Sequence, residues 1–232
     1  MSHILVTGGS RGIGKAICSL FYSKGWKVSY IYNLTEPADD GMLAIKCDVR
    51  DPDSVKNAVA KAEDTNGSID VLVSNSGISV TGLATDFDFD DYHNVMDTNF
   101  GGFFNTTGAV IPSMVHNHKG VIIAVSSMWG QAGASCEALY SASKGAVDSY
   151  VKSLAKELGP SGIRVNAVSP GVINTDMMAG YSADDKRELV GETPLGRLGT
   201  PEDIADTVYF LTTSQASFIT GQIIGVNGGF LI

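Results

Sequence analysis

Residues 3–14 read His-Ile-Leu-Val-Thr-Gly-Gly-Ser-Arg-Gly-Ile-Gly, and this stretch decides the fold class. Its apolar start is typical of a short buried strand, and the residues from Ile13 to Phe21 repeat at the spacing of an amphipathic helix. Gly8, Gly12 and Gly14 lie at the junction, where backbone amides and the positive end of a helix can face a pyrophosphate. The spacing Gly-x-x-x-Gly-x-Gly differs from the ordinary Gly-x-Gly-x-x-Gly fingerprint, so a glycine-rich connection without a ligand is the alternative.

The same alternation of strand and helix continues along the chain. We expect seven strands, at residues 4–6, 27–32, 42–45, 71–74, 121–125, 163–168 and 223–226. A second amphipathic pattern runs from Val147 to Leu158 and ends at Gly159-Pro160. This predicts one α/β domain over residues 1–232, a Rossmann-like, doubly wound parallel sheet with helices on both faces. Residues 33–41 are too few for a normal crossover helix, so we expect a loop there.

Composition excludes several classes of protein. The formal net charge of -9 argues against nucleic-acid binding, which needs clustered Lys and Arg. Apolar runs are too short to span a bilayer, and the first residues do not read as a signal peptide, so we expect a cytoplasmic protein that does not bind a membrane. The three cysteines are far apart, and no histidines stand at ligand spacing, so we expect no metal site.

The chemistry of the second and third strands bears on cofactor choice. A site that prefers NAD usually places an acidic residue at the end of the second strand, whereas that strand ends here in Tyr32-Asn33. Arg11 in the glycine-rich stretch can meet a 2′-phosphate. NADP(H) is therefore favoured over NAD(H), although Glu36 lies close in sequence. Asp48-Val49 either brackets the adenine or caps the next helix, and the two interpretations are equal.

A tyrosine and a lysine one helical turn apart suggest acid–base chemistry. Tyr140, with a side-chain pKa of about 10, is the candidate proton donor to a carbonyl oxygen. Lys144 lies on the same helical face, where its charge is expected to favour tyrosinate. Ser126 and Ser127 follow the fifth strand, so either hydroxyl would reach the same sheet edge and polarise a carbonyl, or would only cap a turn.

Two asparagines are also candidates. Asn99 falls on the apolar face of a predicted helix, where its amide either holds a water that links Lys144 to solvent or bonds a neighbouring main chain. Asn75 and Gly77 follow the fourth strand and predict a tight turn beside the cofactor.

Together, these motifs resemble the classical short-chain dehydrogenase/reductase family over nearly the whole chain: Thr7 to Gly14, Asn75-Ser76-Gly77, Asn99, Ser127, Tyr140-x-x-x-Lys144 and Pro170-Gly171. The resemblance implies a catalytic tetrad of Asn99, Ser127, Tyr140 and Lys144. It also implies cofactor contacts from Gly8, Gly9, Ser10, Arg11, Gly12, Ile13, Gly14, Asn33, Asp48, Val49, Asn75, Ser76, Gly77, Tyr140, Lys144, Pro170, Gly171, Ile173 and Thr175.

Within that family, residues 162–171 and 220–229 look most like bacterial 3-oxoacyl-[acyl-carrier-protein] reductases, which are usually NADPH-dependent homotetramers; a dimer is the alternative. Positions that dock the carrier in those enzymes hold His118 and Ser161 here, which makes charge a poor steering force toward acyl carrier protein. Residues 128–130 and 133–137 look similar to reductases of the 5-aminopentanone group on elongation factor P, so both carbonyl substrates stay open. Residues 177–193 are expected to form a mobile substrate lid, with Trp129 and Met178 lining the pocket; a solvated helix is the alternative to the lid. A non-enzymatic scaffold that senses NADP is the remaining rival.

Overall fold

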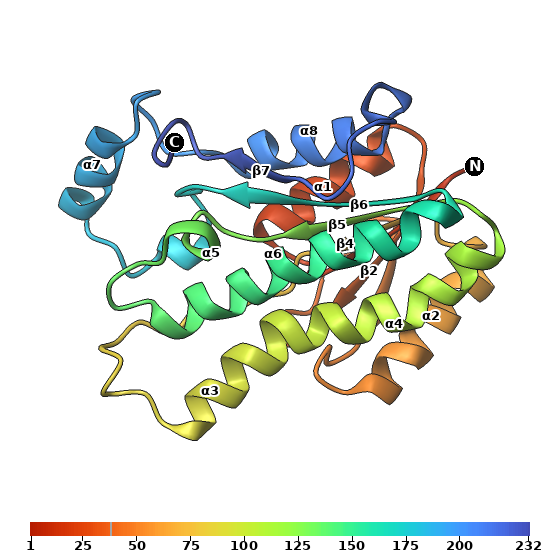
Figure 1. Ribbon diagram of the computed structural model, residues 1–232, viewed down its shortest axis with the longest axis horizontal. Coiled ribbons are helices and arrows are strands. Elements are labelled where there is room, and N and C mark those ends of the chain that lie inside the picture. Colours follow the sequence, from red (N-terminus) through yellow and green to blue (C-terminus); the bar gives the residue numbers. More distant parts are fainter. Residues whose placement is uncertain (38) are drawn as a thin grey trace.

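A computed structural model describes residues 1–37 and 39–232 and has a seven-stranded, entirely parallel sheet at its centre (Figure 1). The strand order is β3-β2-β1-β4-β5-β6-β7. The strands are β1 (His3–Thr7), β2 (Lys27–Tyr32), β3 (Leu43–Lys46), β4 (Val71–Ser74), β5 (Gly120–Val125), β6 (Ile163–Pro170) and β7 (Ile223–Val226). The predicted fold class is confirmed, and each strand starts within one residue of its predicted start. The order reverses at β1, so the switch point lies between β1 and β4.

Helices cover both faces of this sheet. The α-helices among the described residues are α1 (Gly12–Ser23), α2 (Pro52–Asn66), α3 (Phe89–Met96), α4 (Gly102–His116), α6 (Ala138–Leu158), α7 (Ala183–Glu192) and α8 (Pro201–Thr212), and α5 (Trp129–Ala132) is one short turn. In Figure 1, α1 and α8 lie on one face of the sheet, and α2, α4 and α6 lie on the other. As expected, the described residues between β2 and β3 contain no helix, with Ala38 outside the description.

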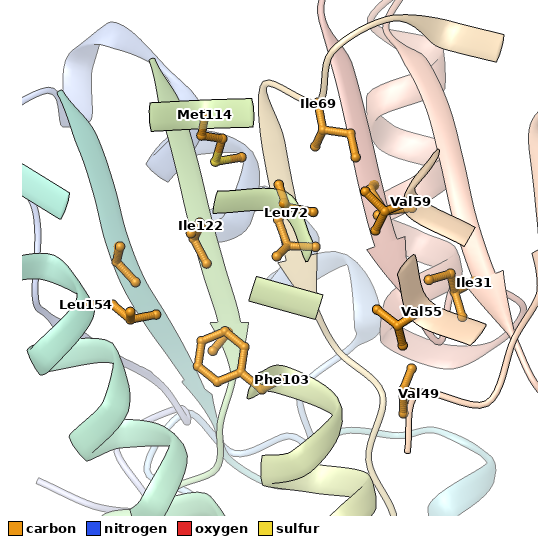
Figure 2. Packing of buried hydrophobic residues seen from close by; sticks show 14 of the residues in the cluster. Ile31, Val49, Val55, Val59, Ile69, Leu72, Phe103, Met114, Ile122 and Leu154 are labelled. Atoms are coloured by element: carbon orange, nitrogen blue, oxygen red, sulfur yellow. The ribbon is translucent and has the colours of Figure 1, made fainter. Parts of the chain in front are cut away.

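Two apolar layers hold the helices to the sheet. The first contains strand residues such as Leu72 and Ile122 and helix residues such as Val55, Phe103 and Leu154, and Figure 2 shows these side chains gathered between helices and strands. The second packs α1 and α8 against the opposite face. Strands buried on both faces need apolar residues at consecutive positions, which is why their sequences do not alternate.

Four of the α-helices start with a residue whose side chain caps the first turn. Asp51 accepts hydrogen bonds from the first-turn amides of α2, and capping boxes begin α3 at Asp88, α7 at Ser182 and α8 at Thr200. Each of these helices also has an acidic residue in its first turn, which complements the positive end of the helix dipole. Within the described residues, every helix is too short or too polar to cross a membrane.

Candidate active site

A cleft of about 470 Å³ opens along the carboxyl ends of the strands. Its walls come from the ends of β1 to β6, from the starts of α1 and α6, and from the segment before α7. Most of the predicted site residues line it: Gly8, Ser10, Arg11, Gly12, Ile13, Asn33, Asp48, Val49, Asn75, Ser76, Gly77, Ser127, Tyr140, Lys144, Pro170, Gly171, Ile173 and Thr175. Residues that are distant in sequence therefore meet at the switch point of the sheet, where open α/β sheets bind their ligands.

The start of α1 differs from that of the capped helices. Arg11 is the N-cap residue, its side chain makes no capping hydrogen bond, and the first turn has no acidic residue. The amides of this turn are left for an external acceptor, and the positive end of the helix dipole faces the cleft without a built-in counter-charge. The helix start therefore fits an anionic group such as a pyrophosphate.

Glycines shape the cradle around that helix start. Gly8 and Gly12 have φ values of +69° and +53°, which residues with a side chain rarely adopt. A Cβ at Gly12 would have the Thr175 methyl group as its nearest neighbour, at 3.6 Å, so the space above this residue is open. A nucleotide phosphate can approach the backbone closely there.

Gly9 and Gly14 lie beneath the cleft rather than on its wall. A Cβ at Gly14 would collide with the Gly8 carbonyl oxygen, and one at Gly9 would collide with the Tyr30 side chain. Both glycines thus allow the strand, the turn and the helix to pack closely. Their predicted cofactor contacts stay predictions.

Asn75 fixes the turn after β4 to the cradle. Its Nδ2 donates to the carbonyl oxygens of Thr7 and Gly8, both at 3.0 Å, and the Thr7 hydroxyl accepts from the amides of Asn75 and Ser76. The ends of β1 and β4 are therefore locked together on the two sides of the switch point.

Asn33 and Asp48 stand at the far end of the cleft. The Asp48 carboxylate accepts hydrogen bonds from the Arg50 side chain, at 3.0 Å from Nε and 2.6 Å from Nη2, and from the Arg50 amide at 3.0 Å. These bonds hold the pKa of Asp48 below its ordinary value, and the Asn33 side chain adds to the effect. The capping interpretation of Asp48 was wrong, since the cap of α2 is Asp51. Asp48 instead forms part of the cleft wall, with much of its charge offset by Arg50.

Ser127, Tyr140 and Lys144 converge at the opposite end. Lys144 is 4% exposed, its Nζ donates to the Val125 carbonyl oxygen at 2.8 Å, and it lies 5.7 Å from the centre of the Tyr140 ring. The Ser127 Oγ accepts from the Trp129 amide at 3.2 Å, which leaves the hydroxyl proton free to donate. Of the two serines, Ser127 contacts Tyr140, whereas the Ser126 hydroxyl donates to the Lys144 carbonyl oxygen on α6 at 3.5 Å.

Burial is the largest cause of the pKa shifts of Lys144 and Tyr140. It lowers the pKa of Lys144 to about 8 and raises the pKa of Tyr140 to about 12, while a hydrogen bond with Ser127 partly offsets the rise for the phenol. Desolvation of the phenol sets the direction of this shift, and the expected effect of Lys144 on Tyr140 stays a prediction. Tyr140 keeps its proton at neutral pH, as a proton donor must.

Asn99 lies behind the cleft and not on its wall. It belongs to a π-helical turn, Asp97–Gly101, that joins α3 to α4, whereas the sequence predicted an ordinary helix. Its Oδ1 accepts from the Ile78 amide at 2.8 Å, and its Nδ2 donates to the Ile78 carbonyl oxygen and the Ser143 hydroxyl, both at 2.9 Å. Of the two interpretations of this amide, the bond to a neighbouring main chain is therefore present.

The chain after β6 forms a further part of the cleft wall. The Pro170 carbonyl oxygen accepts from the Met128 amide at 3.0 Å, and the Gly171 amide donates to Val226 at 3.1 Å. From there the chain passes Ile173 and Thr175 to α7. This helix has no buried residues and forms part of the predicted lid, residues 177–193. Trp129 and Met178 line the cleft, as expected.

Several lining residues were not singled out as site residues in the sequence: Ile78, Ser79, Thr98, Glu137, which lies in the motif 133–137, and Tyr181, which lies in the predicted lid. Glu137 is the most notable of them. Its Oε2 accepts from the Ser79 hydroxyl at 3.1 Å, and burial raises its pKa. The resemblance included Glu137 in a longer motif, but only the fold places this carboxyl group beside Tyr140.

The site geometry agrees with what the chain resembles. A family model described as "Enoyl-(Acyl carrier protein) reductase" matches residues 8–231. An uncharacterized oxidoreductase, YmfI, from Bacillus subtilis is 42% identical, with 97% of each chain covered. A 3-oxoacyl-[acyl-carrier-protein] reductase, FabG, from Chlamydia muridarum is 38% identical over 97% of this chain and 95% of its own.

Among solved structures, a 3-oxoacyl-[acyl-carrier protein] reductase from Brucella melitensis superposes with a TM-score of 0.92 and 35% identity, covering 100% of this chain and 92% of its own. Fold, cleft and relatives agree across the chain. The chain belongs to the short-chain dehydrogenase/reductase family and is an oxidoreductase of this nicotinamide-dependent family.

Proposed function

We propose that this protein is an NADPH-dependent ketoreductase that converts a carrier-bound 3-oxoacyl thioester to the 3-hydroxyacyl thioester. The observation that carries the proposal is the convergence of Ser127, Tyr140 and Lys144 at one end of a cleft whose other end is an uncapped helix start. Relatives named as 3-oxoacyl-[acyl-carrier-protein] reductases support the choice of substrate. We also propose residues 177–193 as the substrate lid and a homotetramer or dimer as the assembly.

Each residue has a separate task. A bound nicotinamide supplies the hydride. The Ser127 hydroxyl donates a hydrogen bond to the carbonyl oxygen of the substrate, which stabilises negative charge as it develops there. Tyr140 gives its proton to that oxygen, and the positive charge of Lys144 stabilises the tyrosinate that remains. Asn99 holds the main chain at Ile78 beside these groups.

The NADP preference rests on the cradle end. Arg11 lies on the cleft wall with its side chain 62% exposed, and its nearest acidic partner, Asp176, is 3.9 Å away. The chain after β2 continues with the uncharged residues Asn33, Leu34 and Thr35, all of which line the cleft. A 2′-phosphate therefore finds a cation and meets no carboxylate directly after β2.

Glu137 favours a second candidate, reduction of the 5-aminopentanone group carried by elongation factor P. Its half-buried carboxyl group lies in the cleft and takes part in none of the ion pairs among the described residues. An ammonium group on the substrate would supply the missing counter-charge, whereas a neutral thioester would not.

The test compares both substrates and both cofactors. NADPH and NADH oxidation is followed with acetoacetyl thioester and with elongation factor P that carries 5-aminopentanone. Turnover of either ketone with NADPH supports the proposal. A Glu137→Gln variant then separates the candidates, since a KM raised about tenfold for the amino-ketone alone indicates the second. Absence of turnover with both ketones and both cofactors would refute the ketoreductase.

A further inference from the structure

Asp148 is a buried acid that the reaction described above does not use. It lies on α6 one turn after Lys144, on the face that packs against the sheet, and is 5% exposed. Both of its carboxylate oxygens are buried without a close hydrogen-bond partner among the described residues. Its neighbours along this face, Val147 and Val151, are apolar core residues, so a leucine would suit the packing at least as well. A carboxyl group in such a place is costly and calls for a functional explanation.

The charges around Asp148 identify its partner. Lys144 and Lys152 flank it on α6, and the Ser126 hydroxyl approaches it from the end of β5. Lys152 is exposed, so solvent screens its charge. Lys144 is buried, and Asp148 is the acidic group that acts on it. Their charged groups are not in direct contact, but attraction between buried charges extends beyond contact distance because little water lies between them.

Burial alone favours the neutral forms of both groups. It lowers the pKa of Lys144 and raises that of Asp148, and the Coulombic effect of each partner opposes the shift of the other. Removal of either charge would leave the other without compensation. Each charge therefore favours the charged form of the other group.

We propose that Asp148 is a positioning residue that keeps a positive charge on Lys144 at the pH at which the enzyme works. Through Lys144 it prepares Tyr140 to give up its proton. The effect of Lys144 on Tyr140 rests on the proposed ketoreductase, whereas the effect of Asp148 on Lys144 concerns the protein without substrate or cofactor.

The first experiment measures Lys144 directly. Protein with ¹³C-labelled lysines is titrated without cofactor, and the Lys144 signal is assigned by its absence in Lys144→Ala. In Asp148→Asn the midpoint of Lys144 is expected to fall by about one pH unit, and Asp148→Leu, which suits the packing and needs no hydrogen bond, carries the same expectation. Asp148→Glu keeps the charge and is expected to stay near the wild type. Glu63→Gln removes a carboxyl group with a buried, unpartnered oxygen on α2 and serves as the matched control.

The second experiment follows function and stability. The alkaline limb of the kcat profile is expected to move to lower pH by the same amount in Asp148→Asn and Asp148→Leu, and Tm is measured beside it to show that each variant is folded. An unchanged Lys144 midpoint in both variants overturns the proposal, whatever happens to activity. A shifted midpoint in a protein that reduces no ketone supports the charge coupling and refutes the proposed function instead.

Discussion

The two ends of the cleft differ in the groups that form them, which are mostly backbone at one end and side chains at the other. The cradle end consists of backbone: two glycines with positive φ, an uncapped helix start and one exposed arginine. The reacting end consists of side chains whose pKa values are shifted by the fold, above all the half-buried Tyr140 and the buried Lys144. The cradle depends on shape and the reacting end on ionisation, so the two should fail in different ways when altered.

The largest effect is expected at the reacting end. Tyr140→Phe removes the proton donor and keeps the ring, so kcat should fall by about two to four powers of ten with little change in cofactor affinity. Steady-state kinetics and fluorescence titration with NADPH measure the two quantities. Tyr150→Phe is the matched control, because Tyr150 lies on the same helix but packs against Phe100 and Phe103. If Tyr140→Phe retained wild-type kcat, another group would have to be the acid.

Added side-chain volume in the glycine cradle should weaken the binding of NADPH. Gly14→Ala places a methyl group against the Gly8 carbonyl oxygen, so the turn must shift. Overpacking of this kind costs about 1–3 kcal/mol, and if the cost falls on the binding geometry it corresponds to a rise of about fivefold to 150-fold in the Kd for NADPH. Gly108→Ala, in α4 and with open space around the new methyl group, is the control and should bind normally. Equal Kd values for the two variants would show that the cradle is not built on this contact.

The contrast also explains what the sequence predicts well. Apolar runs predict strands because a buried parallel strand leaves little room for polar residues, and glycines between a strand and a helix predict the cradle. The perturbed ionisation of Tyr140 depends on how deeply the fold buries it, and this depth is not a local property. The π-helical turn at Asn99 and the meeting of Glu137 with Ser79 likewise arise from tertiary packing that no short pattern encodes.

A smaller effect should separate the two cofactors. Arg11→Gln removes the cation that we assign to the 2′-phosphate, so the KM for NADPH should rise about tenfold while that for NADH changes little. Lys15→Gln, an exposed cation one turn further along α1, is the control. Equal losses with both cofactors would instead place Arg11 on the shared pyrophosphate, and the preference for NADP would need another origin.

The smallest predicted effect requires no mutation. With a Lys144 pKa of about 8, the protonated fraction and with it kcat should fall about fourfold between pH 7 and pH 8.5. The Kd for NADPH should change less than twofold over the same range if the cradle depends on shape.

The pKa of Lys144 is lower in the folded protein than in the unfolded chain, so the unfolded chain holds this proton longer as pH rises from about 8 toward 10.5. Its contribution to the free energy of unfolding therefore increases over that window, because the cost of burying the charge disappears. As pH rises, kcat should therefore fall while the Lys144 contribution to the free energy of unfolding increases. If kcat and the affinity for NADPH fell together, the cradle would depend on the same ionisation as the reacting end.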